Sequence, residues 1–234
     1  MDDPRTQEIA DNLADVRSRI DRACLAAGRD PSEITLVVVT KTFPADDVAR
    51  LADLGVRDVG ENRDQEAAGK AADTAGRGLR WHFIGQLQTN KAASVARYAD
   101  VVHSVDRVEL VQALEKGAAK AGRSLDCLVQ VSLDPDAPAG RGGASADEVK
   151  DVAAAIDDAP HLRLRGVMGV APLGADPAPA FDRLADSLAM LRGIYPDLDV
   201  MSAGMSDDLD EAVMAGATHL RVGSSILGSR ASRG

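Results

Sequence analysis

A lysine follows directly after a nearly continuous apolar run. The run TLVVVT is followed by Lys41 and then by Thr-Phe-Pro. If the run is a strand, the Lys41 amine points to the mouth of a sheet with low-dielectric walls behind it, and burial favours the neutral amine. A neutral amine attacks an aldehyde and forms a Schiff base. The alternative is a surface lysine whose amine simply extends into solvent.

Two turns rich in serine and glycine lie near the end of the sequence. SAGMS contains Ser202, Gly204 and Ser206, and the later GSS contains Gly223 and Ser224. Each turn leads into a helix-like segment, where exposed backbone N–H groups and the helix dipole bind anions. Either turn alone is typical of a helix cap, with Ser206 or the residue after it as the capping side chain. The two turns together indicate a phosphorylated ligand, with Ser202 and Ser224 as phosphate ligands.

Three further polar residues stand in or at the ends of apolar segments. Arg221 lies two residues before Gly223, so strand alternation places it inside a barrel if Gly223 also faces inward. An inward arginine needs a carboxylate, a ring nitrogen or a phosphate as its partner, and the residues leave this choice open. Asn62 either faces a ligand or caps a helix. His82 is expected opposite its two aromatic neighbours, as a satisfied core or rim histidine.

The elements that carry these residues alternate regularly. Short aliphatic segments predict eight strands, at residues 34–40, 57–61, 81–85, 101–105, 127–133, 163–170, 199–202 and 219–223. Helical patterns occupy residues 6–27, where Gly28 is the stop signal, and residues 44–54, 107–121 and 179–194. Strict alternation implies parallel strands with right-handed crossovers. Eight repeats after one extra N-terminal helix predict an α/β fold, a closed (β/α)8 TIM barrel rather than an open sheet.

The barrel would place the chemistry at the ends of its strands. In such folds the site lies on the loops after the strands, and phosphate often binds after strands seven and eight. The two serine turns occupy those positions. The loop-like stretches 134–146 and 172–179 follow strands five and six and are βα loops, so residues 1–234 are expected to form one domain.

Composition excludes several classes of protein. With 27 Lys+Arg against 37 Asp+Glu, the net charge is -10, and the interspersed charges leave no basic patch for nucleic acid or a membrane surface. No apolar run approaches the roughly 20 residues of a membrane helix, and the acidic start lacks a signal-peptide n-region. We therefore expect a cytoplasmic protein. Cys24 and Cys127 have no metal-ligand spacing and are expected to be plain buried residues.

The motifs resemble those of a known family over nearly the whole chain. The segments TKTFPADDV, GENRDQE, WHFIGQLQTNK, RGVMGV, SAGMSDD and LRVGSSILGSR are similar, in order and spacing, to the YggS/PROSC family of pyridoxal phosphate homeostasis proteins. The resemblance implies a barrel like the N-terminal domain of alanine racemase, the fold-type III arrangement. It also implies that pyridoxal 5'-phosphate (PLP) is held as an internal aldimine.

The resemblance also implies a set of cofactor-binding residues. Lys41 falls on the Schiff-base lysine and Asn62 on the asparagine of the GEN motif. The SxGMS loop and the last motif supply the others, which are Ser202, Gly204, Met205, Ser206, Arg221, Gly223 and Ser224. In the last motif the glycine and hydroxyl bind phosphate, and the arginine lies near the pyridine ring. This chain departs locally: Gln86 replaces a frequent proline, and Ser-Ser replaces a common Thr-Ala, which keeps the hydroxyl.

The implied role is that of a carrier without a conventional catalytic reaction. Such a protein would sequester PLP as a monomer and pass it to PLP-dependent apoenzymes. The alternative is a fold-type III enzyme such as an amino-acid racemase, which needs a second acid/base opposite the lysine. Similar racemases supply a tyrosine from a C-terminal β-domain, whereas this sequence ends at Gly234 and its Tyr98 and Tyr195 fall in or near predicted helices. A third alternative is a phosphorylated-sugar enzyme with Glu61 as its proton shuttle.

Overall fold

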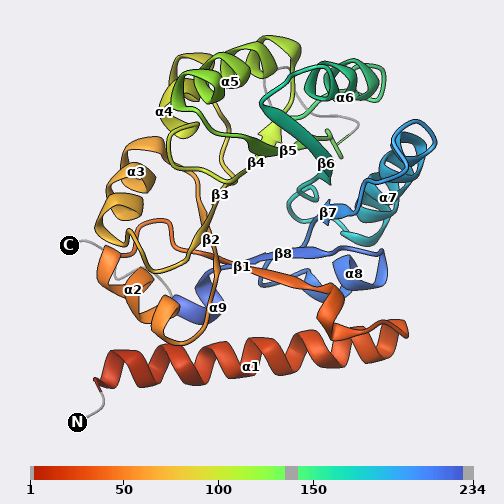
Figure 1. Cartoon of the computed structure of the whole chain (residues 1–234). Coiled ribbons are helices and arrows are strands. Elements are labelled where there is room, and N and C mark those ends of the chain that lie inside the picture. The colour runs from red at the N-terminus through yellow and green to blue at the C-terminus, as the bar shows by residue number, and fades with distance from the viewer. Residues whose placement is uncertain (1–2, 135–141, 229–234) are drawn as a thin grey trace.

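Eight parallel strands close into a barrel in sequential order (Figure 1). The computed structural model describes residues 3–134 and 142–228. The strands are β1 (Thr35–Val39), β2 (Asp58–Glu61), β3 (Arg80–Phe83), β4 (Val101–Val105), β5 (Leu125–Gln130), β6 (Leu162–Met168), β7 (Val200–Ser202) and β8 (His219–Val222). The barrel closes where β1 pairs with β8, with Thr35 opposite His219. The predicted (β/α)8 barrel is confirmed.

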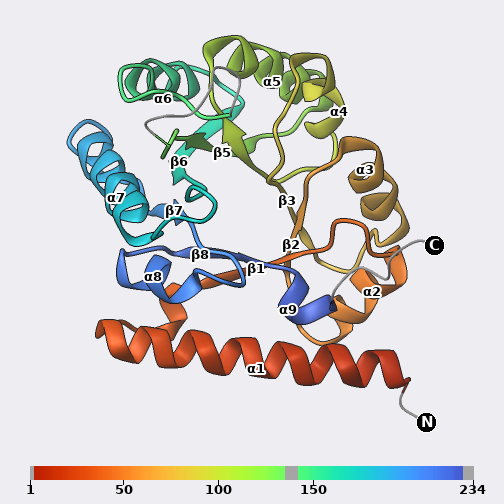
Figure 2. The same cartoon turned by 180° about the vertical axis from the view of Figure 1, so that it is seen from behind.

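Helices surround the barrel. They are α1 (Pro4–Ala27), α2 (Ala45–Asp53), α3 (Asp64–Asp73), α4 (Ala92–Val95), α5 (Val108–Ala121), α6 (Val149–Asp157), α7 (Ala178–Arg192), α8 (Leu209–Met214) and α9 (Ser224–Leu227). In both views α1 lies across the outside of α8 and α9, against which it packs (Figures 1 and 2). The extra N-terminal helix therefore covers the side of the barrel where the first strand, β1, pairs with the last strand, β8.

Local sequence sets the ends of α1. The Asp3 carboxylate accepts the Arg5 N–H at 3.2 Å, Pro4 occupies the first turn, and Gly28 ends the helix at φ 65°. Proline fits a first turn because its missing N–H has no intrahelical partner there, and glycine adopts the left-handed conformation without a steric cost. The buried face includes Ile9, Leu13, Val16, Ile20 and Cys24, which recur every three or four residues, and Ala23 beside them.

The main apolar core lies between the strands and the helices. Trp81 and Phe83 belong to this layer. Inside the barrel, a small separate cluster of Leu128, Met168 and Val200 adjoins buried polar side chains. Cys24 and Cys127 are free and buried, as predicted. Within the described ranges, no helix is long and apolar enough to cross a membrane.

The predicted segments differ from the observed ones mainly at their ends. The first strand ends at Val39 rather than at residue 40, and the seventh begins at Val200. Of the predicted loop 134–146, residues 135–141 lie outside the described residues, as do the last two residues of the motif that ends at residue 230.

Candidate functional site

Six of the predicted site residues line one cavity at the carboxyl ends of the strands. The cavity measures about 330 Å³ and includes Lys41, Met205, Ser206, Arg221, Gly223 and Ser224. Val39, Phe43 and Ile84 add apolar wall. Its size lies near the lower end of the roughly 300–1,000 Å³ range of small-molecule sites. The loops after β1, β7 and β8 therefore converge as the barrel fold requires.

Lys41 lies in a tight turn beyond the sheet. Because β1 ends two residues earlier, Lys41 is exposed, and the expected burial of its amine is wrong. The apolar walls expected near it are present as Val39, Phe43 and Ile84. The next residue, Thr42, has φ 71°, a conformation that a β-branched residue rarely adopts. Its N–H donates to Glu66 Oε1 at 2.5 Å. The turn that presents the lysine amine is thus held in a defined, strained conformation.

A buried lysine braces that turn from behind. Lys70 Nζ donates to the Thr40 carbonyl at 2.7 Å and to Glu61 Oε1 and Glu66 Oε1, each at 2.6 Å. These bonds use all three N–H donors of the ammonium group. Burial raises the pKa of Glu61, against the opposing effect of Lys70 and Thr40. Lys70 therefore holds Thr40, before Lys41, directly, and Thr42, after it, through Glu66.

Sequence analysis missed Lys70, although one signal was present. Glu66 and Lys70 are four residues apart, the spacing at which oppositely charged helical side chains meet. The same network removes Glu61 from the cavity, because its carboxylate faces Lys70 and the Thr40 hydroxyl. The structure thus gives no support to Glu61 as a proton shuttle for a sugar substrate.

Two serine hydroxyls from different loops meet at the cavity. Ser206 Oγ and Ser224 Oγ are 3.2 Å apart. Helix α1 supports the first loop, because Arg19 donates to the Ser206 carbonyl at 2.5 Å and to Asp210 Oδ2 at 2.6 Å. Sequence analysis missed Arg19, since no local pattern connects it to a loop 187 residues away. The paired hydroxyls can donate to an anion.

The helix after this loop begins later than predicted. Neither Ser206 nor Asp207 caps it; α8 starts at Leu209, and the preceding Asp208 makes no side-chain cap bond. Asp208 Oδ1 instead accepts the Met205 N–H at 2.6 Å. The carboxylate therefore closes the loop on itself, and the Ser206 hydroxyl remains available at the cavity.

Gly204 and Gly223 allow the two loops to pack closely. Gly204 has φ 88°, and its carbonyl accepts the Arg221 N–H at 2.9 Å. A Cβ on Gly204 would lie 2.6 Å from Ala212 Cβ, and one on Gly223 would lie 2.8 Å from the Val39 carbonyl oxygen. Both positions exclude any larger side chain unless the backbone moves.

Arg221 faces the barrel interior, as the strand alternation predicts, and borders the cavity. It is 5% exposed and donates to Ser202 Oγ at 2.6 Å and to the Gly169 carbonyl at 2.9 Å. Burial lowers the pKa of Arg221 to about 10. Among the described residues Arg221 has no ion pair, so of the three partners considered for it, a structural carboxylate is absent there. Its remaining N–H donors are available to a ligand.

Ser202 lies deeper than the sequence suggested. It is buried in β7, outside the cavity lining, with its hydroxyl 2.9 Å from His103 Nδ1 as well as bonded to Arg221. The position corrects the expectation that Ser202 belongs to the loop that contacts phosphate, because its strand alternation turns the side chain into the barrel. Ser202 is connected to the cavity only by its hydrogen bond with Arg221.

Asn62 borders a neighbouring cavity rather than the one with Lys41. That cavity measures about 600 Å³ and also includes Arg63, Gln86 and Lys91. Asn62 is not the cap of α3, whose N-cap residue is Arg63. Gly85 packs so tightly on Asn62 that a Cβ there would lie 2.4 Å from the Asn62 carbonyl oxygen. The described residues contain no cluster of His, Cys, Asp and Glu that could hold a metal ion.

Taken together, the fold and the cavity define a parallel α/β barrel of the alanine racemase N-terminal domain class. The family model described as "Alanine racemase, N-terminal domain" matches residues 6–231. Curated relatives narrow the class further. The "Pyridoxal phosphate homeostasis protein" of Mycobacterium tuberculosis strain H37Rv is 42% identical, covering 97% of this chain and 94% of its own. The protein of the same name from Escherichia coli K12 is 38% identical, and the match covers 95% of this chain and 97% of that protein. The chain belongs to the family of pyridoxal phosphate homeostasis proteins.

Solved structures agree with this assignment. PipY of Synechococcus elongatus PCC7942, described with PLP bound, is 34% identical with a TM-score of 0.82, covering 94% of this chain and 100% of its own. Alanine racemase from Corynebacterium glutamicum is 17% identical with a TM-score of 0.72 and shares the fold; the match covers 97% of this chain and 62% of the racemase.

Proposed function

We propose that this chain binds PLP in the 330 Å³ cavity, sequesters its reactive aldehyde and delivers it to PLP-dependent apoenzymes. The observation that carries the proposal is that Lys41, the Ser206–Ser224 hydroxyl pair and Arg221 share that one cavity. The aldehyde forms a Schiff base with Lys41. The curated relatives named for pyridoxal phosphate homeostasis and the PLP-bound PipY structure support the choice of ligand.

The chemical groups of PLP fit the cavity one by one. Phosphate oxygens accept from the hydroxyls of Ser206 and Ser224, and charge-assisted bonds of this kind contribute about 1.5–3 kcal/mol each. The unused N–H donors of Arg221 suit the pyridine nitrogen. Ile84 and Met205 offer apolar contacts to the ring. In this scheme Ser202, Gly204 and Gly223 position Arg221 and the two loops, and Asn62 contacts the ligand from the adjoining cavity.

The proposed role is sequestration rather than catalysis. Racemisation needs a second acid/base opposite the lysine. Neither Tyr98 nor Tyr195 lines the cavity, and burial raises the pKa of Tyr98. The exposed Lys41 turn lets a recipient protein approach the bound aldehyde. We also propose that residues 1–234 form one PLP-binding domain that acts as a monomer. A cytoplasmic location is part of the proposal, and the two buried free cysteines fit that reducing compartment.

The deciding experiment is reduction of the PLP-loaded protein with borohydride, followed by peptide mass mapping. We expect the trapped adduct on Lys41 and its loss in Lys41→Ala. Lys91→Ala is the matched control, because Lys91 lines the adjoining cavity and should leave the adduct unchanged. An adduct on another lysine would remove Lys41 from its proposed role.

Activity assays on the same loaded protein separate carrier from enzyme. The carrier proposal predicts transfer of PLP to an added apoenzyme and no exchange of the α-proton of alanine. Rapid α-proton exchange would overturn the non-catalytic part of the proposal while leaving the cofactor site intact.

A further inference from the structure

A line of buried polar side chains crosses the interior of the barrel. It joins Arg221, Ser202, His103, His82 and Asp58, and we call these five residues the interior chain. The separations are 2.6 Å from Arg221 NH1 to Ser202 Oγ and 2.9 Å from Ser202 Oγ to His103 Nδ1. They continue at 2.8 Å from His103 Nε2 to His82 Nδ1 and at 2.9 Å from His82 Nε2 to Asp58 Oδ1.

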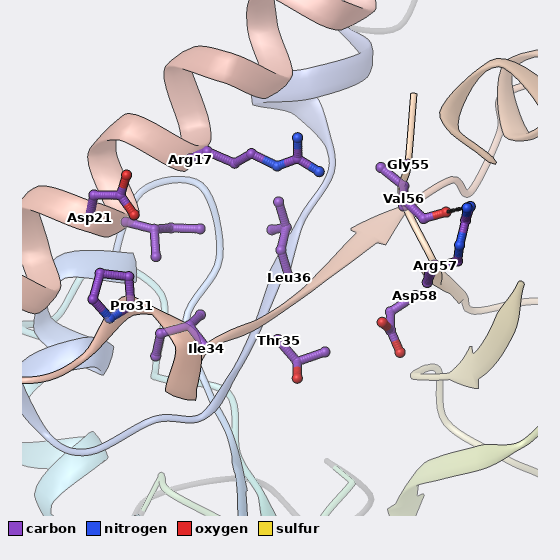
Figure 3. Close-up of a pocket in the computed structure, with 11 residues that line it drawn as sticks. Arg17, Asp21, Pro31, Ile34, Thr35, Leu36, Gly55, Val56, Arg57 and Asp58 are labelled. Carbon is purple, nitrogen blue, oxygen red and sulfur yellow. Dashed lines mark hydrogen bonds between the residues drawn. The ribbon is translucent and has the colours of Figure 1, made fainter. Parts of the chain in front are cut away.

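The two ends of the interior chain open into different cavities. Arg221 borders the cavity with Lys41, at the carboxyl ends of the strands. Asp58 begins β2 and borders a cavity of about 360 Å³ at the opposite end, between α1 and the starts of β1 and β2 (Figure 3). The Asp58 side chain is 21% exposed, whereas His82, His103 and Ser202 are each at most 1% exposed. The interior chain thus connects solvent at one mouth with the ligand pocket at the other.

The donor and acceptor of every hydrogen bond in the interior chain follow from the ionised Asp58 carboxylate and the neutral state of the two histidines. An ionised carboxylate only accepts, so His82 Nε2 carries the proton that bonds Asp58. Burial lowers the pKa of His82 and holds that of His103 well below its usual value, so both rings are neutral and each has one acceptor nitrogen. His103 Nε2–H must therefore donate to His82 Nδ1, and the Ser202 hydroxyl to His103 Nδ1. The Ser202 oxygen is then free to accept from Arg221.

Other charged groups near the histidines do not offer a competing direction. His219 lies beside both rings, with centroids 6.2 Å from His82 and 6.5 Å from His103, and its Nδ1 is 3.0 Å from Thr218 Oγ1. Arg80 and Asp100 act on His82 only through space. Asp58 is the one carboxylate within hydrogen-bond distance of either ring among the described residues.

We propose that Asp58 orients Arg221 across the barrel through the interior chain and so tunes how firmly the pocket holds its ligand. Arg221 is a buried cation without an ion pair among the described residues, and the aligned bonds place the negative charge of Asp58 at the far end of its hydrogen-bond chain. All five residues are positioning residues in this role, except that Arg221 also faces the ligand. The part of this inference that concerns ligand binding rests on the proposed function.

The first test uses the ligand-free protein and long-range ¹⁵N–¹H NMR correlation of the histidine rings. We expect His82 and His103 to be neutral and protonated at Nε2. Asp58→Asn keeps the shape but lets an amide present either its oxygen or its NH₂ group, so both histidines should become mixtures of tautomers. Asp21→Asn is the matched control, because Asp21 borders the same cavity without joining the interior chain, and it should change neither ring.

An Nδ1-protonated His82 or His103 in the unmodified protein would overturn the proposed direction. Unchanged tautomers in Asp58→Asn would overturn the control by Asp58.

The second test measures PLP retention and the absorption spectrum of the bound cofactor in the same variants. Asp58→Asn should bind PLP about three- to tenfold more weakly, the effect of one poorly oriented hydrogen bond, with a shifted absorption band. Asp21→Asn should match the unmodified protein. Altered tautomers with unaltered retention would overturn the link to the pocket. If the unmodified protein failed to bind PLP, the proposed function would fail, while the NMR test would still decide the interior chain.

Discussion

At the scale of single residues, the turn that contains Lys41 is held by the ammonium group of Lys70, a residue of α3. Lys70 is 6% exposed, and its ammonium group is the hub between Thr40, Glu61 and Glu66. Lys70→Met should lower the free energy of unfolding by about 3–5 kcal/mol, because the buried Glu61 carboxylate would lose its positively charged partner and keep only the Thr40 hydroxyl. Urea denaturation measures this loss.

Two further variants separate charge from packing in this network. The double variant Lys70→Met with Glu61→Gln should recover part of the lost stability, since no buried charge remains unpaired. Lys116→Met, at an exposed lysine in α5, is the surface control and should change stability by less than about 0.5 kcal/mol. A loss below about 1 kcal/mol in Lys70→Met would contradict a tightly coupled buried network.

The residue types at strand ends predicted much of the site, but not which side chains line the cavity and which lie buried beneath it. Lys41, Ser206, Arg221 and Ser224 were singled out by type and position, and the structure brings them to one cavity. Ser202 looked equivalent to Ser206, and only the strand boundary and the contact with His103 separate their positions. The partner of Ser202 lies 99 residues away in the chain, so no local pattern encodes it.

At the scale of elements, the loop after β7 depends on a glycine for two separate reasons. Gly204 has φ 88°, and a Cβ there would lie 2.6 Å from Ala212 Cβ. Gly204→Ala should therefore lose about 1 kcal/mol or more for the backbone conformation and about 1–3 kcal/mol for overpacking. The loop should also shift away from Arg221, whose N–H bonds the Gly204 carbonyl.

Gly216→Ala is a matched control for this prediction. Gly216 has φ 97°, yet a Cβ there would meet nothing within 4 Å, so only the conformational cost applies. Urea denaturation of the two variants gives the packing cost as their difference. Equal losses would show that Ala212 yields and that the close approach is not needed.

The alternation of aliphatic segments and helices predicted the barrel because each βα unit repeats the same local signals. The pattern was clear for α1, whose apolar spacing and Gly28 stop match the observed helix. The pattern was weak for β7, which has three residues, and the start of α8 was misplaced because its cap makes no side-chain bond. Support of the loop after β7 by Arg19 in α1 is a tertiary contact without any local signal.

At the scale of the whole molecule, the barrel interior makes stability depend on pH. Burial holds the pKa of His103 well below its usual value, lowers that of His82, and lowers that of His219 to about 4. In the unfolded chain these groups bind protons near pH 6.5. Between pH 6.5 and about 4 the unfolded state therefore binds more protons than the folded state. The stability contributed by the neutral histidines is present above pH 6.5 and is lost as the pH falls.

The slope of this loss identifies its source. Each buried histidine contributes up to about 1.4 kcal/mol per pH unit within the window. Glu61 acts in the opposite direction, because burial raises its pKa and its proton uptake favours the folded state. His219→Gln should therefore reduce the measured slope of unfolding free energy between pH 6.5 and 5. Thr218→Ala removes the neighbouring hydroxyl without removing a titrating group, so it should lower stability at every pH and leave the slope intact. An unchanged slope in His219→Gln would mean that the ring takes up its proton inside the folded barrel, which its burial and the adjoining histidines make costly.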